Sequence, residues 1–265
     1  MVLPFSKFHG AGNDFILIDN RENQYSLSQK QIHFLCQQHI GIGADGLILF
    51  QKSIVKETDF SMKYYNSDGF EGTMCGNGGR CITAFAYLQG IRKMNFIFEA
   101  IDGLHYSEIL TGNDKGSFDI KLQMKSVSLV KEYKEYYFID TGSPHLVVFV
   151  DNAKNADVLG MGKMLRYDTK ITENGTNVDF VSFSHGRLFV RTYERGVENE
   201  TLSCGTGITA SAIAIAKKLD LPFNTIAIDT LGGDFEVSFE FTDQEYRNIW
   251  LRGPVTKVFN GEIEL

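Results

Sequence analysis

The chain has 265 residues, a length that suits one large domain or two smaller ones with a real hydrophobic core. Its formal net charge is −7, which argues against a nucleic-acid surface and against a polybasic membrane patch. The first residues lack the charged and apolar regions of a secretory signal, and no apolar run is long enough to span a membrane. We therefore expect a cytoplasmic protein with reduced cysteines and no membrane or nucleic-acid partner.

The first half of the chain alternates strand patterns with two helical ones. A capped amphipathic helix is expected at residues 26–39, with Ser26 or Ser28 as its cap, and an alanine-containing buried helix at 78–90. Strands are expected at residues 15–19, 46–51, 60–66 and 117–124, and a pair of strands at 94–110 around a turn at Asp102 and Gly103.

The second half repeats this order of elements. Two strands flank Gly142 in residues 136–150, and a hairpin with its turn at His185 and Gly186 is expected in residues 177–196. An apolar, alanine-rich helix follows at 208–219, then strands within 225–241, and strands within 248–259 around Gly253 and Pro254.

A Cys-Gly-x-Gly pattern occurs in both halves. "KYYNSDGFEGTMCGNG" (63–78) aligns with "RTYERGVENETLSCGTG" (191–207) with one extra residue, and each cysteine then opens a helix of small residues. A repeat of this length indicates duplication and two pseudo-symmetric lobes. The alternative is coincidence between two strand–loop–helix units.

The repeat places Cys75 and Cys204 at helix N-termini. Unpaired backbone N–H groups and the positive end of the helix dipole favour the thiolate, so we expect a lowered thiol pKa at both positions. The glycines let a carboxylate approach those N–H groups. With one thiol on each side of a substrate, one can remove a proton from carbon while the other delivers one to the opposite face. Such a reaction inverts a stereocentre and needs no metal or cofactor.

The remaining cysteine and glycine signals are weaker. Cys36 and Cys81 suit inert core positions. "GIGADG" (41–46) has the spacing of a dinucleotide-binding loop, but a helix precedes it and a strand follows it, which is the wrong order for that motif. A non-enzymatic dinucleotide- or metal-binding module is therefore the weaker alternative.

Three signatures resemble the diaminopimelate epimerase family. They are "FHGAGNDF" (8–15), "MCGNGGRC" (74–81) and "YERGVENETLSCGTG" (193–207), with "GIGADGL", "GSPH" and "TNVDFV" between them in the family's order. The resemblance spans nearly the whole chain. It implies an α+β fold of two pseudo-symmetric lobes, each a curved, mostly antiparallel sheet wrapped around a central helix, with the site in the cleft. The lobes would be residues 1–116 with 253–265, carrying Cys75, and residues 117–252, carrying Cys204.

The resemblance also implies the reaction and its residues. The chain would be a cofactor-independent isomerase that interconverts LL- and meso-2,6-diaminopimelate, with Cys75 and Cys204 as the acid–base pair and a homodimer as a plausible assembly. Backbone N–H groups would hold the reacting carboxylate at Gly76, Asn77, Gly205 and Thr206. The substrate's other groups would be held by Asn13, Asn66, Asn177, Glu194 and Arg195, while His145 and Glu194 would tune the thiols.

Several of these residues also have a purely structural interpretation. Glu194 and Arg195 suit a surface ion pair at a turn, Asn13 and Asn66 suit turn chemistry, and His145 suits a strand cap. The sequence departs from the family at Ser143, where many members carry Asn, and at Gly46, where some carry Gln. Both departures bear on contacts with the distal end of the substrate.

Two other enzymes fit parts of the pattern. Paired cysteines also suit a proline or hydroxyproline racemase, whose substrate lacks a second amino-acid head group. An isomerase on a related scaffold without paired thiols would tolerate loss of Cys75.

Overall fold

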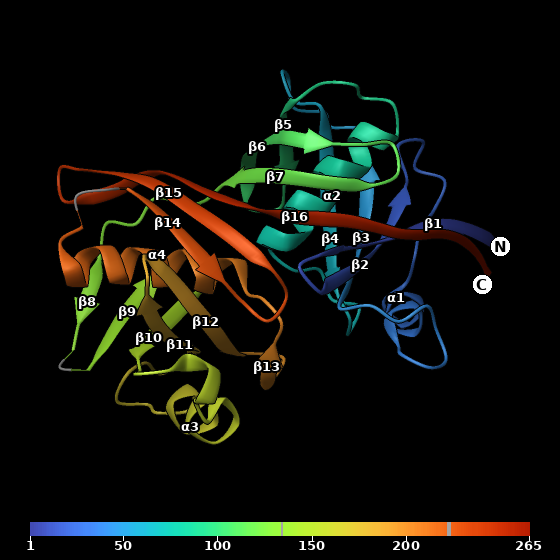
Figure 1. The fold of residues 1–265 in the computed structure, drawn as a ribbon. Coiled ribbons are helices and arrows are strands. Elements are labelled where there is room, and N and C mark those ends of the chain that lie inside the picture. Colours follow the sequence, from blue (N-terminus) through green and yellow to red (C-terminus); the bar gives the residue numbers. More distant parts are fainter. Residues whose placement is uncertain (134, 222–223) are drawn as a thin grey trace. The chain divides into compact units, whose positions relative to one another are not determined.

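A computed structural model describes residues 1–133, 135–221 and 224–265 (Figure 1). The described chain divides into two compact units: unit 1 comprises residues 1–122 and 253–265, and unit 2 comprises residues 123–252. Residues 117–122, assigned above to the C-terminal lobe, belong to unit 1, because they form a strand that pairs with two other strands of that unit. No helix in the described residues combines the length and apolar character needed to cross a membrane.

Unit 1 is a curved sheet around one buried helix. Its strands pair in chain order, and the last strand of the chain pairs with both β7 and β1, which closes the sheet. The termini meet there, where the backbones of Met1 and Leu265 exchange hydrogen bonds. The elements are β1 (Val2–Gly10), β2 (Asn13–Asp19), α1 (Gln29–Cys36), β3 (Gly46–Gln51), β4 (Phe60–Asn66), α2 (Gly76–Leu88), β5 (Asn95–Ala100), β6 (Gly103–Gly112), β7 (Ser117–Gln123) and the end of β16 (Glu245–Glu264).

Unit 2 has the same plan around a second buried helix. Its strand order is β16, β15, β14, β12, β11, β10, β9, β8, and β13 pairs with β12. The elements are β8 (Val130–Glu132), β9 (Tyr136–Asp140), β10 (Pro144–Phe149), η1 (Ala153–Asn155), α3 (Val158–Arg166), β11 (Asn177–Ser184), β12 (Arg187–Glu194), β13 (Asn199–Thr201), α4 (Gly205–Leu219), β14 (Thr225–Asp229), β15 (Asp234–Thr242) and the start of β16.

The two units share one sequence of strand directions. In unit 1, β1–β2 is antiparallel, β2–β3 parallel, β3–β4 antiparallel and β4–β5 parallel. In unit 2, β9–β10, β10–β11, β11–β12 and β12–β14 follow the same alternation. The internal repeat and the predicted fold class are therefore confirmed, with α2 equivalent to α4.

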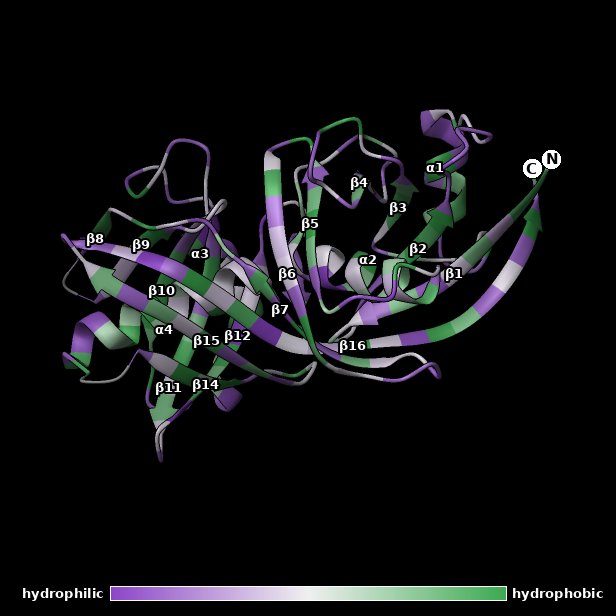
Figure 2. Cartoon of the chain, turned by 90° about the horizontal axis from the view of Figure 1, so that it is seen from above, coloured by the Kyte–Doolittle hydropathy of each residue, from purple (hydrophilic) through white to green (hydrophobic). Residues whose placement is uncertain are grey.

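The repeated helices are the cores of their units. Most residues of α2 and α4 are buried, and both sequences are rich in small residues. The buried stretch of α2 also includes the polar residues Asn77, Arg80 and Thr83. In unit 1, the ring of Phe85 on α2 packs edge-on against Phe8 and Phe50 at 5.9 and 5.6 Å between centroids. The surrounding strands carry both polar and apolar residues, as the mixed colours of β6 show in Figure 2. In β7 the two kinds alternate strictly, and the apolar side chains are the buried ones.

Local expectations differ from the structure in several places. The sequence did not predict strands β1, β8 and β13. The sequence did not predict α3, which begins after its cap Asp157 but contains two glycines that weaken the helical pattern. The break expected at Gly253 and Pro254 is absent from the described strand β16, which continues through both residues. Residues 253–256 of β16 pair with β7, and this pairing keeps the backbone extended through Gly253 and Pro254.

Candidate active site

Cys75 and Cys204 are the N-cap residues of the two repeated helices. Each has extended backbone geometry and stands directly before the first helical residue, Gly76 or Gly205. The first turn of a helix has backbone N–H groups without intrahelical partners, and these groups point toward the N-cap. Each unit thus presents a thiol beside a potential carboxylate site, as the repeated motif predicts.

In unit 1, Cys75 belongs to an asparagine network. Its Sγ lies 3.6 Å from Oδ1 of Asn13, and Nδ2 of Asn77 donates to the same oxygen at 3.1 Å. The Nδ2 of Asn13 donates to the Asp45 carboxylate at 2.6 Å. The structure therefore brings together three of the residues predicted from sequence: Asn13, Cys75 and Asn77.

Arg80, which the sequence did not single out, lies one turn along α2 from this network. Its side chain is fully buried and donates to Oδ1 of Asn77 at 2.7 Å and to the carbonyl of Gly76 at 3.3 Å. Burial lowers the pKa of the guanidinium to about 10, against opposing interactions with Cys81, Cys75 and Asp119. The guanidinium stays charged at neutral pH, and a cation here favours a thiolate over a thiol at Cys75.

Gly46 and Asn66 lie opposite each other at the end of the β3–β4 pair. A Cβ on Gly46 would stand 2.5 Å from the Tyr64 ring, so the tyrosine occupies the space that a glutamine would need. Asn66 is exposed and opens the turn that follows β4, with its carbonyl accepting from the Gly69 N–H. In unit 1 the departure at Gly46 is thus accommodated by a neighbouring side chain.

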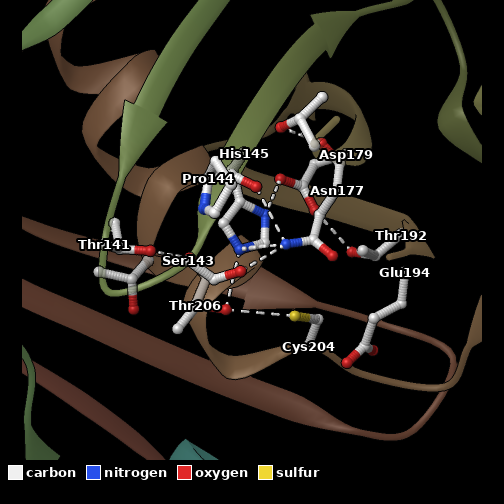
Figure 3. Close-up of polar contacts among 12 residues, drawn as sticks. Thr141, Ser143, Pro144, His145, Asn177, Asp179, Thr192, Glu194, Cys204 and Thr206 are labelled. Atoms are coloured by element: carbon white, nitrogen blue, oxygen red, sulfur yellow. Dashed lines mark hydrogen bonds and ion pairs between the residues drawn. The ribbon is translucent and has the colours of Figure 1, made fainter. Parts of the chain in front are cut away.

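In unit 2, Cys204 is linked to a buried histidine through a threonine (Figure 3). The Sγ of Cys204 lies 3.4 Å from Oγ1 of Thr206, which lies 2.8 Å from Nε2 of His145. The other ring nitrogen of His145 lies 2.8 Å from the carboxylate of Asp179, and both side chains are 0% exposed. Asp179 and the Thr206 hydroxyl were not identified from the sequence as site residues. A signal for Asp179 was present, because a carboxylate inside the apolar run "NVDFV" is unusual in a buried strand.

The electrostatic environment of Cys204 corrects the expectation of a lowered pKa. Burial raises the pKa of the Cys204 thiol well above its ordinary value, and the carboxylates of Glu194 and Asp179 raise it further. The contact with the Thr206 side chain and a hydrogen bond from the Gly207 backbone lower the pKa of Cys204 without reversing the shift. The helix N-terminus is therefore outweighed by desolvation and negative charge, and Cys204 rests as a thiol.

Asn177 and Arg195 are joined in the same unit. The backbone N–H of Arg195 donates to Oδ1 of Asn177 at 2.8 Å, and Nδ2 of Asn177 donates to Oγ of Ser143 at 2.9 Å. The second family departure, Ser143, therefore provides an acceptor for a predicted binding residue. Glu194 ends β12 and accepts from Oγ1 of Thr201 at 2.9 Å.

Cys36 and Cys81 differ from the two N-cap cysteines. Both are buried in unit 1, at 3% and 0% exposure. Burial raises the pKa of Cys36 to about 12 and raises the pKa of Cys81 even further. Both side chains remain thiols at neutral pH, which agrees with their interpretation as core residues.

The second glycine of the Cys204 motif makes room for the histidine–aspartate pair. A Cβ on Gly207 would stand 2.4 Å from Oδ1 of Asp179 and 3.1 Å from Cε1 of His145. We expect Gly207→Ala to lower the free energy of unfolding by about 1–3 kcal/mol and to displace the pair. Gly78→Ala, whose Cβ would meet side-chain carbons of Ile48 and Met62 at 3.2 Å, is the matched control. Urea unfolding of both variants checks this, and equal midpoints would contradict it.

Comparison with known proteins identifies one family over nearly the whole chain. A family model described as diaminopimelate epimerase matches residues 5–130 and 137–258. Diaminopimelate epimerases of Flavobacterium psychrophilum and Chlorobaculum tepidum are 48% and 40% identical; both alignments cover 97% of this chain, with 98% and 99% of the respective relatives.

Solved structures at low identity share the fold. A Bacillus anthracis phenazine biosynthesis protein of the PhzF family has a TM-score of 0.78 at 14% identity, covering 100% of both chains. A hydroxyproline epimerase from Agrobacterium vitis, solved with trans-4-hydroxy-L-proline, has a TM-score of 0.71 at 14% identity, covering 99% of this chain and 91% of that one. At such identities the likeness concerns architecture alone.

Proposed function

The chain belongs to the diaminopimelate epimerase family, and from this premise we propose that it interconverts LL- and meso-2,6-diaminopimelate for lysine and peptidoglycan synthesis. The observation that carries the proposal is the pairing of a full-length family match with two cysteines that begin equivalent helices. A hydroxyproline or proline racemase also uses such a pair, but the relatives with high identity carry the diaminopimelate name.

In the proposed mechanism, one thiolate removes the α-proton and the other thiol donates a proton to the opposite face of the α-carbon. The substrate's α-carboxylate would be held by backbone N–H groups at Gly76, Asn77, Gly205 and Thr206, which stabilise the charge that develops beside it in the transition state. The α-proton reaches one sulfur while an S–H bond breaks at the other, so the charge balances without a cofactor.

The two thiols have opposite electrostatic surroundings, as the mechanism requires. The Arg80 guanidinium accompanies Cys75, whereas the carboxylates of Glu194 and Asp179 accompany Cys204. We therefore propose that Cys204 rests as the thiol and that Arg80 makes a thiolate at Cys75 less costly.

The distal end of diaminopimelate carries a second ammonium and carboxylate. We propose that the Arg195 guanidinium binds this carboxylate and that side-chain oxygens bind the ammonium, because a planar guanidinium matches carboxylate geometry. The other distal contacts would come from Asn13, Asn66, Asn177 and Glu194. His145, linked to Cys204 through Thr206, and Glu194, whose carboxylate raises the pKa of Cys204, would tune that thiol.

Location and assembly complete the proposal. A cytoplasmic location suits the mechanism, because both cysteines must stay reduced to exchange protons. The family also predicts a homodimer, which sedimentation velocity of the full chain would test.

The reaction is tested by proton NMR in D₂O under strong reductant. LL-diaminopimelate, L-proline and trans-4-hydroxy-L-proline are offered separately, and the α-proton signal is followed. We expect exchange and inversion with diaminopimelate alone, because the distal head group is part of the recognition. Exchange with proline instead would overturn the substrate, and absence of exchange with all three, with free thiols confirmed, would overturn the reaction.

A further inference from the structure

A chain of short contacts extends from Cys204 into the core of unit 2 (Figure 3). It runs from the sulfur to the Thr206 hydroxyl, then to Nε2 of His145, and from Nδ1 of His145 to the Asp179 carboxylate, at 3.4, 2.8 and 2.8 Å. Asp179 is held in turn by Oγ1 of Thr192, which donates to Oδ1 at 2.7 Å. The inner members of this chain, His145 and Asp179, are fully buried, whereas Thr206 next to the thiol is partly exposed.

The neighbours of His145 determine where its ring proton lies. The Arg195 backbone N–H can only donate, so the Asn177 atom that it contacts is the carbonyl oxygen, and the Asn177 amide nitrogen faces His145. The two protons of that amide nitrogen have nearer acceptors, Oγ of Ser143 at 2.9 Å and the Pro144 carbonyl at 3.0 Å, so its 3.3 Å contact with Nε2 does not fix the ring proton. The Asp179 carboxylate fixes it, because a carboxylate only accepts. Nδ1 therefore carries the proton that Asp179 accepts at 2.8 Å, and Nε2 of the neutral ring is the unprotonated nitrogen.

The same logic orients the Thr206 hydroxyl. Because Nε2 of His145 is an acceptor, the hydroxyl donates to it. The hydroxyl oxygen keeps free lone pairs toward Cys204, and the S–H donates to them. The threonine is also fixed through its carbonyl, which accepts from Oγ1 of Thr141 at 2.9 Å. All hydrogen bonds from the thiol to the carboxylate thus point one way, toward Asp179.

Unit 1 shows that the fold does not need this buried pair. In unit 2, His145 stands opposite Asn177, the first residue of β11, and Asp179 follows two residues later. The corresponding positions of unit 1 hold Phe15, opposite Gly46 at the start of β3, and Ile48. The helix glycines agree, since Gly207 faces Asp179 and His145 whereas Gly78 faces Ile48. Burying polar and charged groups is costly where apolar residues would pack, which argues for a chemical role in unit 2.

We propose that Thr206, His145 and Asp179 form a proton relay that converts Cys204 from thiol to thiolate, with Asp179 as the positioning residue. The Cys204 S–H bond breaks as its proton passes to Oγ1 of Thr206. The Thr206 O–H proton passes at the same time to Nε2 of His145. The products are a thiolate, an intact hydroxyl and an imidazolium, while Asp179 stays a carboxylate, and the reverse path restores the thiol. This inference rests on the proposed function, in which Cys204 alternates between base and acid.

The relay answers a difficulty that burial creates. Desolvation and the nearby Glu194 and Asp179 carboxylates disfavour a lone thiolate at Cys204. An imidazolium formed within the same cluster compensates the new negative charge, and Asp179 stabilises that imidazolium. Cys204 can then act as a base without transferring its proton to solvent. Asp179 thus affects the Cys204 thiolate in two opposite ways. Its negative charge repels the thiolate directly, but it also stabilises the His145 imidazolium that compensates the charge of the thiolate.

Thr206→Val and Asp179→Asn test the relay, with two matched controls. Thr206→Ser keeps the hydroxyl, and both threonine variants keep the backbone N–H. Thr209→Val removes a hydroxyl from the same helix one turn further on, where it donates to the Gly205 carbonyl at 2.9 Å. We expect Thr206→Val and Asp179→Asn to lower kcat by about 10²-fold or more with little change in KM. Thr206→Ser and Thr209→Val should retain most of the rate.

A second readout needs no substrate. In a Cys75→Ala background, the rate of Cys204 alkylation by iodoacetamide near neutral pH follows the accessible thiolate. The relay predicts a fall of about ten- to hundredfold in Thr206→Val and a fall in Asp179→Asn as well. If Asp179 affected Cys204 only through its negative charge, Asp179→Asn would instead speed the alkylation of Cys204. ¹⁵N-histidine NMR should place the His145 proton on Nδ1 in the unmodified chain, and this assignment does not depend on access to the thiol.

The outcomes separate the relay from the proposed function. Faster alkylation in Asp179→Asn, full turnover in Thr206→Val, or a proton on Nε2 of His145 would each overturn the relay. If the unmodified chain does not turn over diaminopimelate, the proposed function fails, while alkylation and NMR still decide whether the relay exists.

Discussion

Replacing either N-cap cysteine by serine is expected to reduce epimerisation of diaminopimelate below detection. Serine keeps the size and hydrogen-bonding capacity of cysteine, but an alcohol is a far weaker acid than a thiol and supplies no usable anion near neutral pH. Loss of a positioned acid or base costs about 10²–10⁴-fold, and inversion needs both groups in every turnover. The measurement is the rate of conversion between LL- and meso-diaminopimelate in Cys75→Ser and Cys204→Ser, with Cys36→Ala as a control on a buried thiol outside the site.

Solvent exchange in D₂O distinguishes lost chemistry from lost folding in these variants. A chain with one remaining thiol can still remove and return the α-proton on its own face of the substrate. Exchange of this proton with D₂O, without inversion, is therefore expected from a variant whose site is still folded. The two variants should differ in the isomer that exchanges. Sustained inversion by either single variant would contradict the two-thiol mechanism.

Replacing Arg195 by methionine is expected to lower kcat/KM for diaminopimelate by roughly 30- to 4,000-fold, the effect of removing one partner of a desolvated charge pair. The backbone N–H of Arg195 still holds Asn177 in this variant, so only the side chain is tested. Arg247→Met removes a 48% exposed arginine of unit 2 and is the control for net charge. Steady-state kinetics of both variants give the comparison.

The result for Arg195 also decides between substrates. A proline-type substrate has no distal carboxylate, so its turnover should be nearly unaffected by Arg195→Met. If kcat/KM for diaminopimelate were unchanged in this variant, Arg195 would not be the distal ligand. The proposed binding set would then lose its cation, and the racemase alternative would gain support.

The repeat, the fold class and the elements with strong local signals could be predicted from the amino-acid sequence. The predicted ranges 46–51 and 60–66 coincide with β3 and β4, and the hairpin turn lies at His185 and Gly186, both with positive φ. The thiols could be located because a cysteine before Gly-x-Gly and a small-residue helix is a local pattern. Family signatures then supplied the reaction.

The surroundings of each thiol depend on contacts between residues far apart in the chain. His145 meets Asp179 across 34 residues of chain, and Cys75 meets Asn13 across 62, so no local pattern announces either contact. The charge near each thiol depends on burial as well as on residue type, which is why the helix N-terminus did not set the protonation state of Cys204. The sequence repeats the thiol, whereas the packing of Ile48 in one unit and Asp179 in the other makes the two copies chemically different.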